Sequence, residues 1–331
     1  FDTFLFADSR DVGYSYLWTH PPLEHFGALF FPFIDGSDIV LRTPLGRGVG
    51  RFKLYTGLSR QKVTSMMGQH QWADNITTGP IGSIDDLGGS RMTGGHIEYQ
   101  DDHWLLRLGH AQMKHQKSFP PGSFDLRGYI AAEGANALAG DPARGIAPNP
   151  LLGNAALRFV EGSGVAGKQV TFDSLAMAYE DGPLQMQMAA SRIKGDSLLF
   201  PNYKSGYAAV GYRVDRITPY ALVSTIRSKM SDRASELQRL GASAGLVSVT
   251  TFALQSPLTT QTTYSLGMRY EYSDTIALKF QADFTRNKDC SPVALPLGST
   301  PACAPPLLWP TVPVNWNGRA QTYSATLDFI F

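Results

Sequence analysis

The chain has 331 residues, and 29 Lys and Arg residues nearly balance 28 Asp and Glu residues, which gives a net charge of +1. This balance argues against a nucleic-acid-binding protein, which would be distinctly basic, and against an acidic disordered chain. Although 43% of residues are hydrophobic, the longest apolar run is FGALFFPFI at 26–34. A spanning helix needs roughly 18 apolar residues, so any membrane crossing would have to use strands closed into a barrel.

The opening segment, residues 1–35, lacks a clean period. It mixes aromatic residues with charged ones, including Asp8, Arg10 and Asp11. Such a mixture is unsuited to a lipid-facing strand, so we expect a segment folded into a lumen or a loop. The chain begins at Phe1 without a basic-then-apolar signal, which indicates a processed or trimmed product.

From Gly36 onward, segments of alternating apolar and polar residues come in pairs joined by short turns, as in β-hairpins. The pairs are 39–45 with 52–58, 96–100 with 104–110, 168–179 with 184–192, 207–213 with 217–227, and 262–272 with 276–285. In the last pair, Leu266 and Phe280 belong to an apolar face, and Arg269 and Lys279 to the opposite one. Arms of about 10 residues are long enough for tilted strands to cross a bilayer.

Long segments rich in Gly, Pro, Ser and Asn separate these pairs. They are 59–91, 113–167, 193–205, 228–259 and 287–319. A soluble sandwich has no reason to place every short connection at one end, whereas a membrane barrel has short turns at one end and long loops at the other. We therefore predict one domain over 1–331, an all-β transmembrane antiparallel barrel.

The last residues, AQTYSATLDFIF at 320–331, alternate strictly and end on an aromatic residue. They resemble the C-terminal strand of Gram-negative outer-membrane β-barrels, and with the hairpins they make the chain similar to porins. The opening segment bears a fainter likeness to phosphate-selective porins, whose substrate is not carried over because no dense ladder of Arg and Lys is evident. The resemblance implies about 16 strands in the complete protein, with 12 to 18 as the range, and allows some of them to precede Phe1.

The porin likeness also implies location and partners. We expect the bacterial outer membrane, contact with its lipid and lipopolysaccharide, small hydrophilic solutes, and a homotrimer, the common state of large porins. Nothing in the residues indicates a cofactor, a metal or a catalytic set, and nucleic acid is not expected as a partner.

The inward positions of the alternating strands carry charges that would face a water-filled lumen. The predicted pore-lining and selectivity residues are Lys53, Glu98, Arg107, Arg269, Glu271, Lys279 and Asp283. Charged side chains lining a pore set the field that a passing ion meets. The alternative is that they are wall charges paired with one another, without effect on selectivity.

Two segments are candidates for a constriction inside the barrel. One is the long loop at 113–167, with Lys114, Lys117 and Arg127, whose Ala- and Gly-rich middle suits close packing against the wall. The other is the opening segment, with Asp8, Arg10 and Asp11. A cap of external loops is the alternative for both.

Only two cysteines occur, Cys290 and Cys303, in one Pro-rich segment. This usage predicts a loop-closing disulfide in an oxidising compartment, with a pair of free thiols as the alternative.

Two other functions are weighed against the channel. The string at 195–198, GDSL, matches that of an esterase and lipase family. Its surroundings argue against that match, because an antiparallel arm precedes it and no helix follows. A barrel-borne ester or lipid hydrolase is nevertheless kept as the second hypothesis. A third is a structural barrel enclosing a partner protein. Residues 233–246 have weak helical spacing and are either a short helix or a solvated loop.

Overall fold

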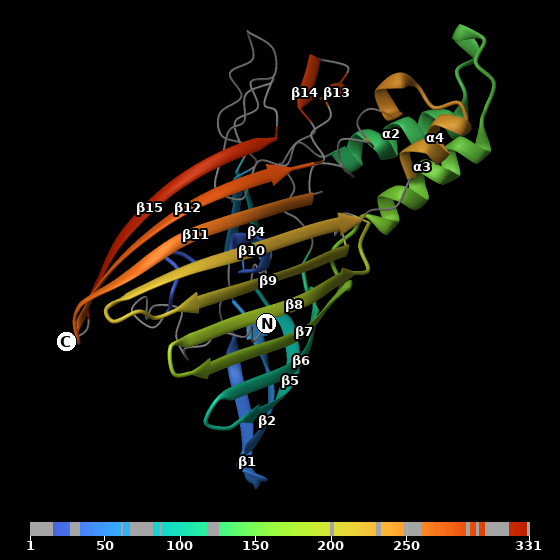
Figure 1. Cartoon of the computed structure of the whole chain (residues 1–331). Helices are drawn as coiled ribbons and strands as arrows, with labels where there is room; N and C mark the ends of the chain where they lie inside the picture. Colours follow the sequence, from blue (N-terminus) through green and yellow to red (C-terminus); the bar gives the residue numbers. More distant parts are fainter. Residues whose placement is uncertain are drawn as a thin grey trace.

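The computed structural model describes residues 16–26, 34–60, 62–66, 82–86, 88–117, 126–198, 202–229, 233–247, 250, 260–288, 292–295, 298–301 and 318–329. Its main feature is an 11-stranded antiparallel sheet in which neighbours in space follow one another along the chain (Figure 1). The strands are β1 (Asp35–Leu45), β2 (Gly48–Ser59), β5 (Ser90–Gln100), β6 (Trp104–Lys114), β7 (Gln169–Asp181), β8 (Leu184–Gly195), β9 (Asn202–Tyr212), β10 (Ile217–Lys229), β11 (Thr260–Ser273), β12 (Ile276–Asn287) and β15 (Arg319–Phe329).

The prediction of an all-β antiparallel fold is confirmed, and the five predicted hairpins are the pairs β1–β2, β5–β6, β7–β8, β9–β10 and β11–β12. Their turns lie at one end of the sheet, together with the end of β15, and the long connections leave from the other end (Figure 1). Two of these connections contain small separate hairpins, β3 (Lys62–Met66) with β4 (Gly82–Asp86) and β13 (Pro292–Leu295) with β14 (Gly298–Pro301). The sheet has 11 strands within the described residues, against about 16 expected for the complete protein.

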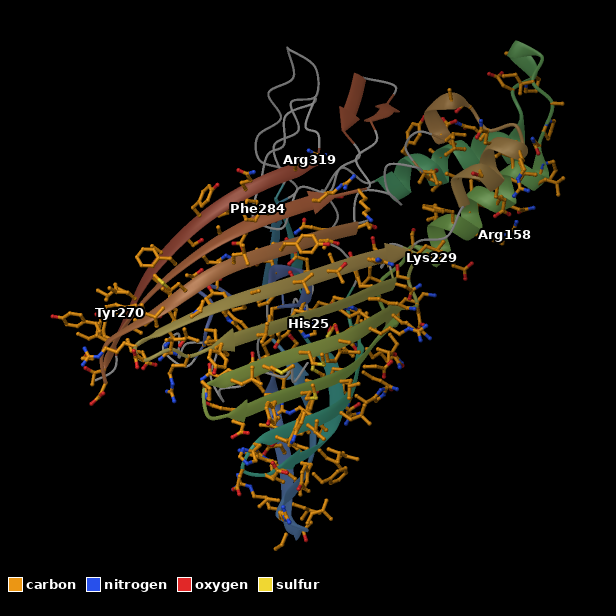
Figure 2. The ribbon with its side chains drawn as sticks, viewed as in Figure 1. His25, Arg158, Lys229, Tyr270, Phe284 and Arg319 are labelled. Carbon is orange, nitrogen blue, oxygen red and sulfur yellow. The ribbon has the colours of Figure 1, made fainter. Side chains whose placement is uncertain are left out.

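The outward face of the sheet is apolar and exposed. On β11, Tyr264 and Leu266 are 60% and 61% exposed, whereas Ser265 between them is buried. The same alternation holds on β15, where Tyr323 and Leu327 point outward. Tyr270 lies toward the short-turn end of this face, and Arg319 and Lys229 lie at the long-loop end (Figure 2).

The inward face is partly covered, because residues 16–26 lie across it. This segment includes the short helix α1 (Leu23–Phe26), which contacts β8, β9, β10 and β11. Tyr16, Trp18 and Phe26 pack against Tyr207 and Leu222 of the wall. The inward face of β7 is apolar for this reason, since Ala176 and Ala178 belong to the same cluster. Both faces of β7 are therefore apolar, one toward the segment and one toward the outside.

The long loop between β6 and β7 forms helices beyond the strand ends (Figure 1). They are α2 (Leu126–Ala139) and α3 (Pro150–Gly162), which pack with α4 (Arg233–Arg239) from the loop after β10. The expectation that this loop folds into the barrel as a constriction is wrong for its described residues. Its small residues serve another contact: a Cβ on Gly134 would lie 3.0 Å from the Cβ of Ala156, so the glycine lets α2 and α3 approach closely.

The wall has the architecture of a transmembrane β-barrel of the bacterial outer membrane. Among the described residues, no helix is long and apolar enough to cross a membrane. The exposed apolar face of the sheet would be unfavourable in water and suits lipid, and paired strands satisfy their backbone polar groups without water. Short turns at one end and long loops at the other are the outer-membrane pattern. Fold class and location therefore agree with the prediction from the sequence.

Candidate functional site

The inward face of β2, β5 and β6 carries one compact ion-pair group. Glu98 of β5 is buried and accepts hydrogen bonds from Arg107 of β6, with Nε and Nη2 each 2.7 Å from Oε2. Nη1 of Arg51 on β2 lies 3.7 Å from the other carboxylate oxygen. Strand register brings the three side chains together, since Arg51 pairs with Glu98 and Glu98 with Arg107. Two charge-assisted contacts from one guanidinium to a single carboxylate oxygen fix both side chains against the wall.

Lys53, two residues along β2, also faces inward and pairs with Asp38 of β1 at 3.4 Å. Its side chain is 24% exposed and lies 5.9 Å from the ring centre of Tyr55. Of the charges predicted to line a pore, Lys53 is therefore one that stays accessible.

Three other predicted pore residues face inward but lie beneath residues 16–26. Arg269 and Lys279 donate to the backbone carbonyls of Tyr16 and Trp18, at 3.5 and 3.4 Å. Asp283 contacts His20. All three are buried, and Lys279 is 0% exposed. They hold the segment on the wall instead of facing open water.

The same region contains two further ion pairs between neighbouring positions. Glu271, the remaining predicted pore residue, lies 3.3 Å from Nη2 of Arg269 and is about one-third exposed. Lys279 also lies 2.9 Å from the carboxylate of Asp328 on β15. The burial cost of each cation is thus offset by a carboxylate or a carbonyl.

Glu24 of α1 is the strongest attachment between the segment and the wall. Its carboxylate is 2% exposed and accepts hydrogen bonds from Ser224 of β10, Thr263 of β11 and Gln261, the last at 2.7 Å. Its neighbour His25 is also buried, which lowers its pKa to about 4, so that it is neutral at pH 7. In Figure 2, His25 lies over the middle of the sheet.

His20 forms the exposed end of this attachment. Its Nε2 lies 3.0 Å from Asp283, and this hydrogen bond raises the pKa of His20 against the opposing effect of burial. A pKa raised in the folded protein stabilises it at low pH, because the folded state binds the proton more tightly. That stabilisation is complete below the unfolded value of about 6.5 and is lost as the pH rises through the folded pKa.

We therefore expect residues 16–26 to be held less firmly at pH 9 than at pH 6. Wild-type protein in lipid vesicles should show a lower guanidinium midpoint at the higher pH, and His20→Gln should lose this component of the difference. Parallel midpoint curves for the two proteins would contradict the role of His20.

Glu24 and His20 are site residues that were not predicted from the sequence. Both occur in a segment without periodicity, and their partners lie about 200 or more positions away in the chain. The charge content of the opening segment was the available signal. Asp8, Arg10 and Asp11, chosen from that segment as constriction residues, lie outside the described residues, as do Cys290 and Cys303.

The constriction residues predicted in the loop do not line the interior. Lys114 follows the outward parity of β6 and is exposed on the outer face, which corrects that prediction. Lys117 is exposed beyond the end of β6, and Arg127 belongs to α2.

Ser197, the nucleophile expected of a hydrolase, has a structural contact. It is 3% exposed, and its hydroxyl donates to the carbonyl of Ser163 at 3.2 Å, joining the loop after β8 to the end of α3. Within the described residues, no group of three or more His, Cys, Asp or Glu side chains is arranged to hold a metal ion.

No protein-family model and no curated protein sequence matches this chain. Among solved structures, an anion-selective porin from Comamonas acidovorans matches with a TM-score of 0.40 and 13% identity, over 79% of this chain and 52% of that one. The chain thus spans about half the length of that structure. An outer membrane protein of Vibrio cholerae, OmpT in a trimer form, matches with a TM-score of 0.37 and 8% identity, over 89% and 91% of the two chains. LpxR from Salmonella typhimurium matches at 0.25 and 9%, over 89% and 88%.

Proposed function

We propose that the chain is the wall of an outer-membrane channel through which small hydrophilic solutes or ions diffuse passively. The observation that carries the proposal is the division of one sheet between an apolar, exposed face and an inward face with Glu98, Arg107, Lys53 and Asp38. Inward charges of this kind need water or ionic partners, which a lumen provides.

Residues 16–26 take the role that the long loop was expected to have. They cover the inward face of β8 to β12. The ion pairs of β2, β5 and β6 lie farther along the sheet, outside the part that this segment covers. We infer that solutes pass on the side of β2, where Lys53 is accessible, and that the segment narrows the passage. Charged residues at a narrowing have the largest influence on which ions pass.

Recording currents from the purified protein in planar lipid bilayers tests the channel. Stepwise increases in conductance are expected as molecules insert. Purified protein that inserts into vesicles but conducts no ions would contradict the proposal, and ester hydrolysis abolished by Ser197→Ala would replace it with the hydrolase.

Lys53→Glu should shift the ion preference toward cations. The change removes one positive charge and adds one negative charge on the inward face. For an ion about 10 Å away in water, two charge units are worth roughly 0.8 kcal/mol, or about a fourfold change in local cation concentration. The reversal potential in a salt gradient measures this shift.

Lys194→Glu is the matched control for this experiment, because Lys194 of β8 is exposed on the outward parity. It makes the same change in net charge on the other side of the wall. Equal shifts for the two variants would show that Lys53 does not face the conduction path.

A further inference from the structure

The outward face of the wall contains a groove of about 1120 Å³ over β1, β2 and β5 to β9. Its walls are apolar side chains of outward parity, with Ile39, Leu54, Ile97, Leu108 and Leu175 all at least 50% exposed. The inward-parity serines that also line it, Ser174, Ser191 and Ser205, are buried, so their backbone forms the floor between outward side chains.

A glycine lies in the middle of the groove lining. Gly95 of β5 lies between Leu54 of β2 and His110 of β6 in one row across the sheet. It has no side chain, and a Cβ there would lie 2.5 Å from the carbonyl oxygen of Lys53 and 2.8 Å from Cδ2 of Leu54, so a glycine is needed where Leu54 lies over this position.

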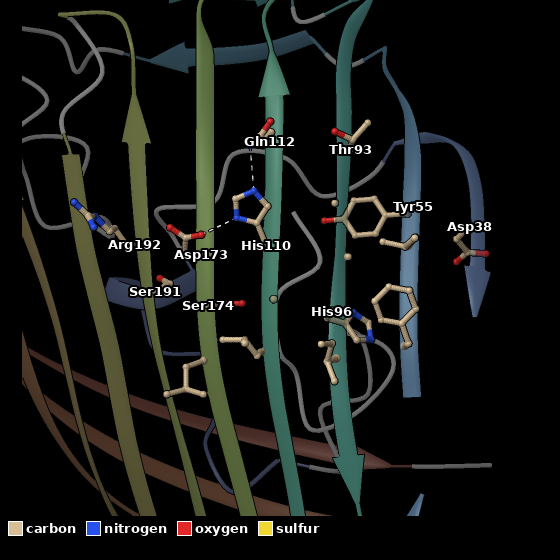
Figure 3. Close-up of a pocket in the computed structure, with 18 of the residues that line it drawn as sticks. Asp38, Tyr55, Thr93, His96, His110, Gln112, Asp173, Ser174, Ser191 and Arg192 are labelled. Atoms are coloured by element: carbon tan, nitrogen blue, oxygen red, sulfur yellow. Dashed lines mark hydrogen bonds and ion pairs between the residues drawn. The ribbon is translucent and has the colours of Figure 1, made fainter. Parts of the chain in front are cut away.

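A polar edge closes the groove toward the long-loop end. His110 lies 2.7 Å from the carboxylate of Asp173 and 3.2 Å from the amide of Gln112, and Figure 3 shows the three side chains grouped together on β6 and β7. Arg192 and Lys204 continue the edge on β8 and β9.

The cations on this edge stand directly beside one another. Arg192 pairs in register with Lys204, and Lys204 pairs with Arg227 of β10. All three side chains are exposed on the outward face, and none has an ion-pair partner among the residues that the structure describes. Asp173 of β7 stands opposite Arg192 on its other side, so one carboxylate accompanies the three cations of this row. Like charges directly opposite each other destabilise a sheet, so a further anion beside Lys204 and Arg227 would be stabilising.

The position of this edge indicates the anion. It lies where the outward face changes from apolar to polar, at the end with long loops, which is the external end of outer-membrane barrels. An occupant must therefore reach from the lipid interior to the external surface, with an apolar part over Leu108 and Leu175 and an anionic part at the cations.

We propose that this groove binds lipopolysaccharide of the outer leaflet through its lipid A. A phosphate lies on Arg192, Lys204 and Arg227, and an acyl chain lies along Ile97, Leu108 and Leu175. The carboxylate of Asp173 is held by His110 and keeps the phosphate toward the β9 side of the edge. The inference rests on the orientation of the wall in the membrane and is independent of the channel.

Binding of lipid A to the delipidated, detergent-solubilised protein tests the proposal. Arg192→Gln with Lys204→Gln should weaken binding of diphosphorylated lipid A roughly 30-fold, from about 1 kcal/mol for each cation at tenfold per 1.4 kcal/mol. Leu108→Trp should weaken it as well, by filling the groove. Circular dichroism should show that both variants keep the wild-type strand content.

Arg286→Gln is the matched control, because Arg286 of β12 is exposed on the outward parity but does not line the groove. It should bind lipid A as the wild type does, and lipid A without phosphates should bind poorly to every variant. Equal losses for Arg286→Gln and the double variant would overturn the proposal in favour of a diffuse surface charge. Equal affinity for phosphatidylglycerol would overturn it in favour of a general anionic surface.

Discussion

Phe280→Arg should destabilise the protein by about 2–4 kcal/mol in lipid vesicles, the cost of an outward arginine near the bilayer midplane. Phe280 of β12 is 49% exposed and stands at the centre of a run of outward residues that extends from Ile276 to Phe284. Equilibrium unfolding in guanidinium, followed by tryptophan fluorescence, measures the loss. The result separates a membrane wall from a soluble sheet, since the same exposed position in water would change stability by about 0.5 kcal/mol or less.

Gln321→Arg is the control for depth in the membrane. Gln321 of β15 points outward like Phe280, but it pairs with Phe284 near the long-loop end, and the outward residue before it in β15 is Arg319. Its substitution should cost less than about 1 kcal/mol. If both variants were equally stable, the outward face would not be in lipid.

Glu24→Ala should release residues 16–26 from the wall and increase the conductance of the proposed channel. The substitution removes an acceptor of three hydrogen bonds, from Ser224, Gln261 and Thr263, and leaves these donors on the inward face. Hydrogen bonds to a charged group contribute about 1.5–3 kcal/mol each, so we expect a loss of about 3 kcal/mol or more in the binding of the segment. Single-channel conductance and proteolytic cleavage within the segment both report the release.

Glu180→Ala provides the matched control for the loss of a glutamate. Glu180 lies at the end of β7, is exposed and accepts a hydrogen bond from Gln185 at 3.1 Å, away from the segment. Its variant should conduct and resist protease as the wild type does. Unchanged conductance and protease resistance in Glu24→Ala would show that Glu24 does not hold the segment.

The strands could be predicted from the sequence because their two faces meet different surroundings. On β11, Tyr264, Leu266 and Met268 alternate with Ser265 and Arg269, so the period of two is visible without any knowledge of neighbours. The alternation along β6 also indicates from the sequence that Lys114 points outward. Trp104 and Leu108 point outward, and the same parity continued along β6 places His110 and Lys114 outward as well.

The helices of the long loop had local signals too. Asn149 caps α3 by accepting from the backbone of Leu152, Pro150 occupies the first turn, and Leu152, Ala156 and Phe159 recur on one buried face. The position of residues 16–26 could not have been predicted in this way. The contacts of Glu24 and His20 join segments more than 190 positions apart, and no periodicity within the segment identifies its partners.

The helical cluster beyond the strand ends is built from two separate loops. Ile130 of α2 and Phe159 of α3 follow β6, whereas Leu237 of α4 follows β10, and all three share one buried core. That core is therefore incomplete until the loop after β10 has reached the same end of the sheet as the loop after β6. During biogenesis both loops must be translocated before these helices can dock, so docking of α4 marks a late step in the assembly of the wall.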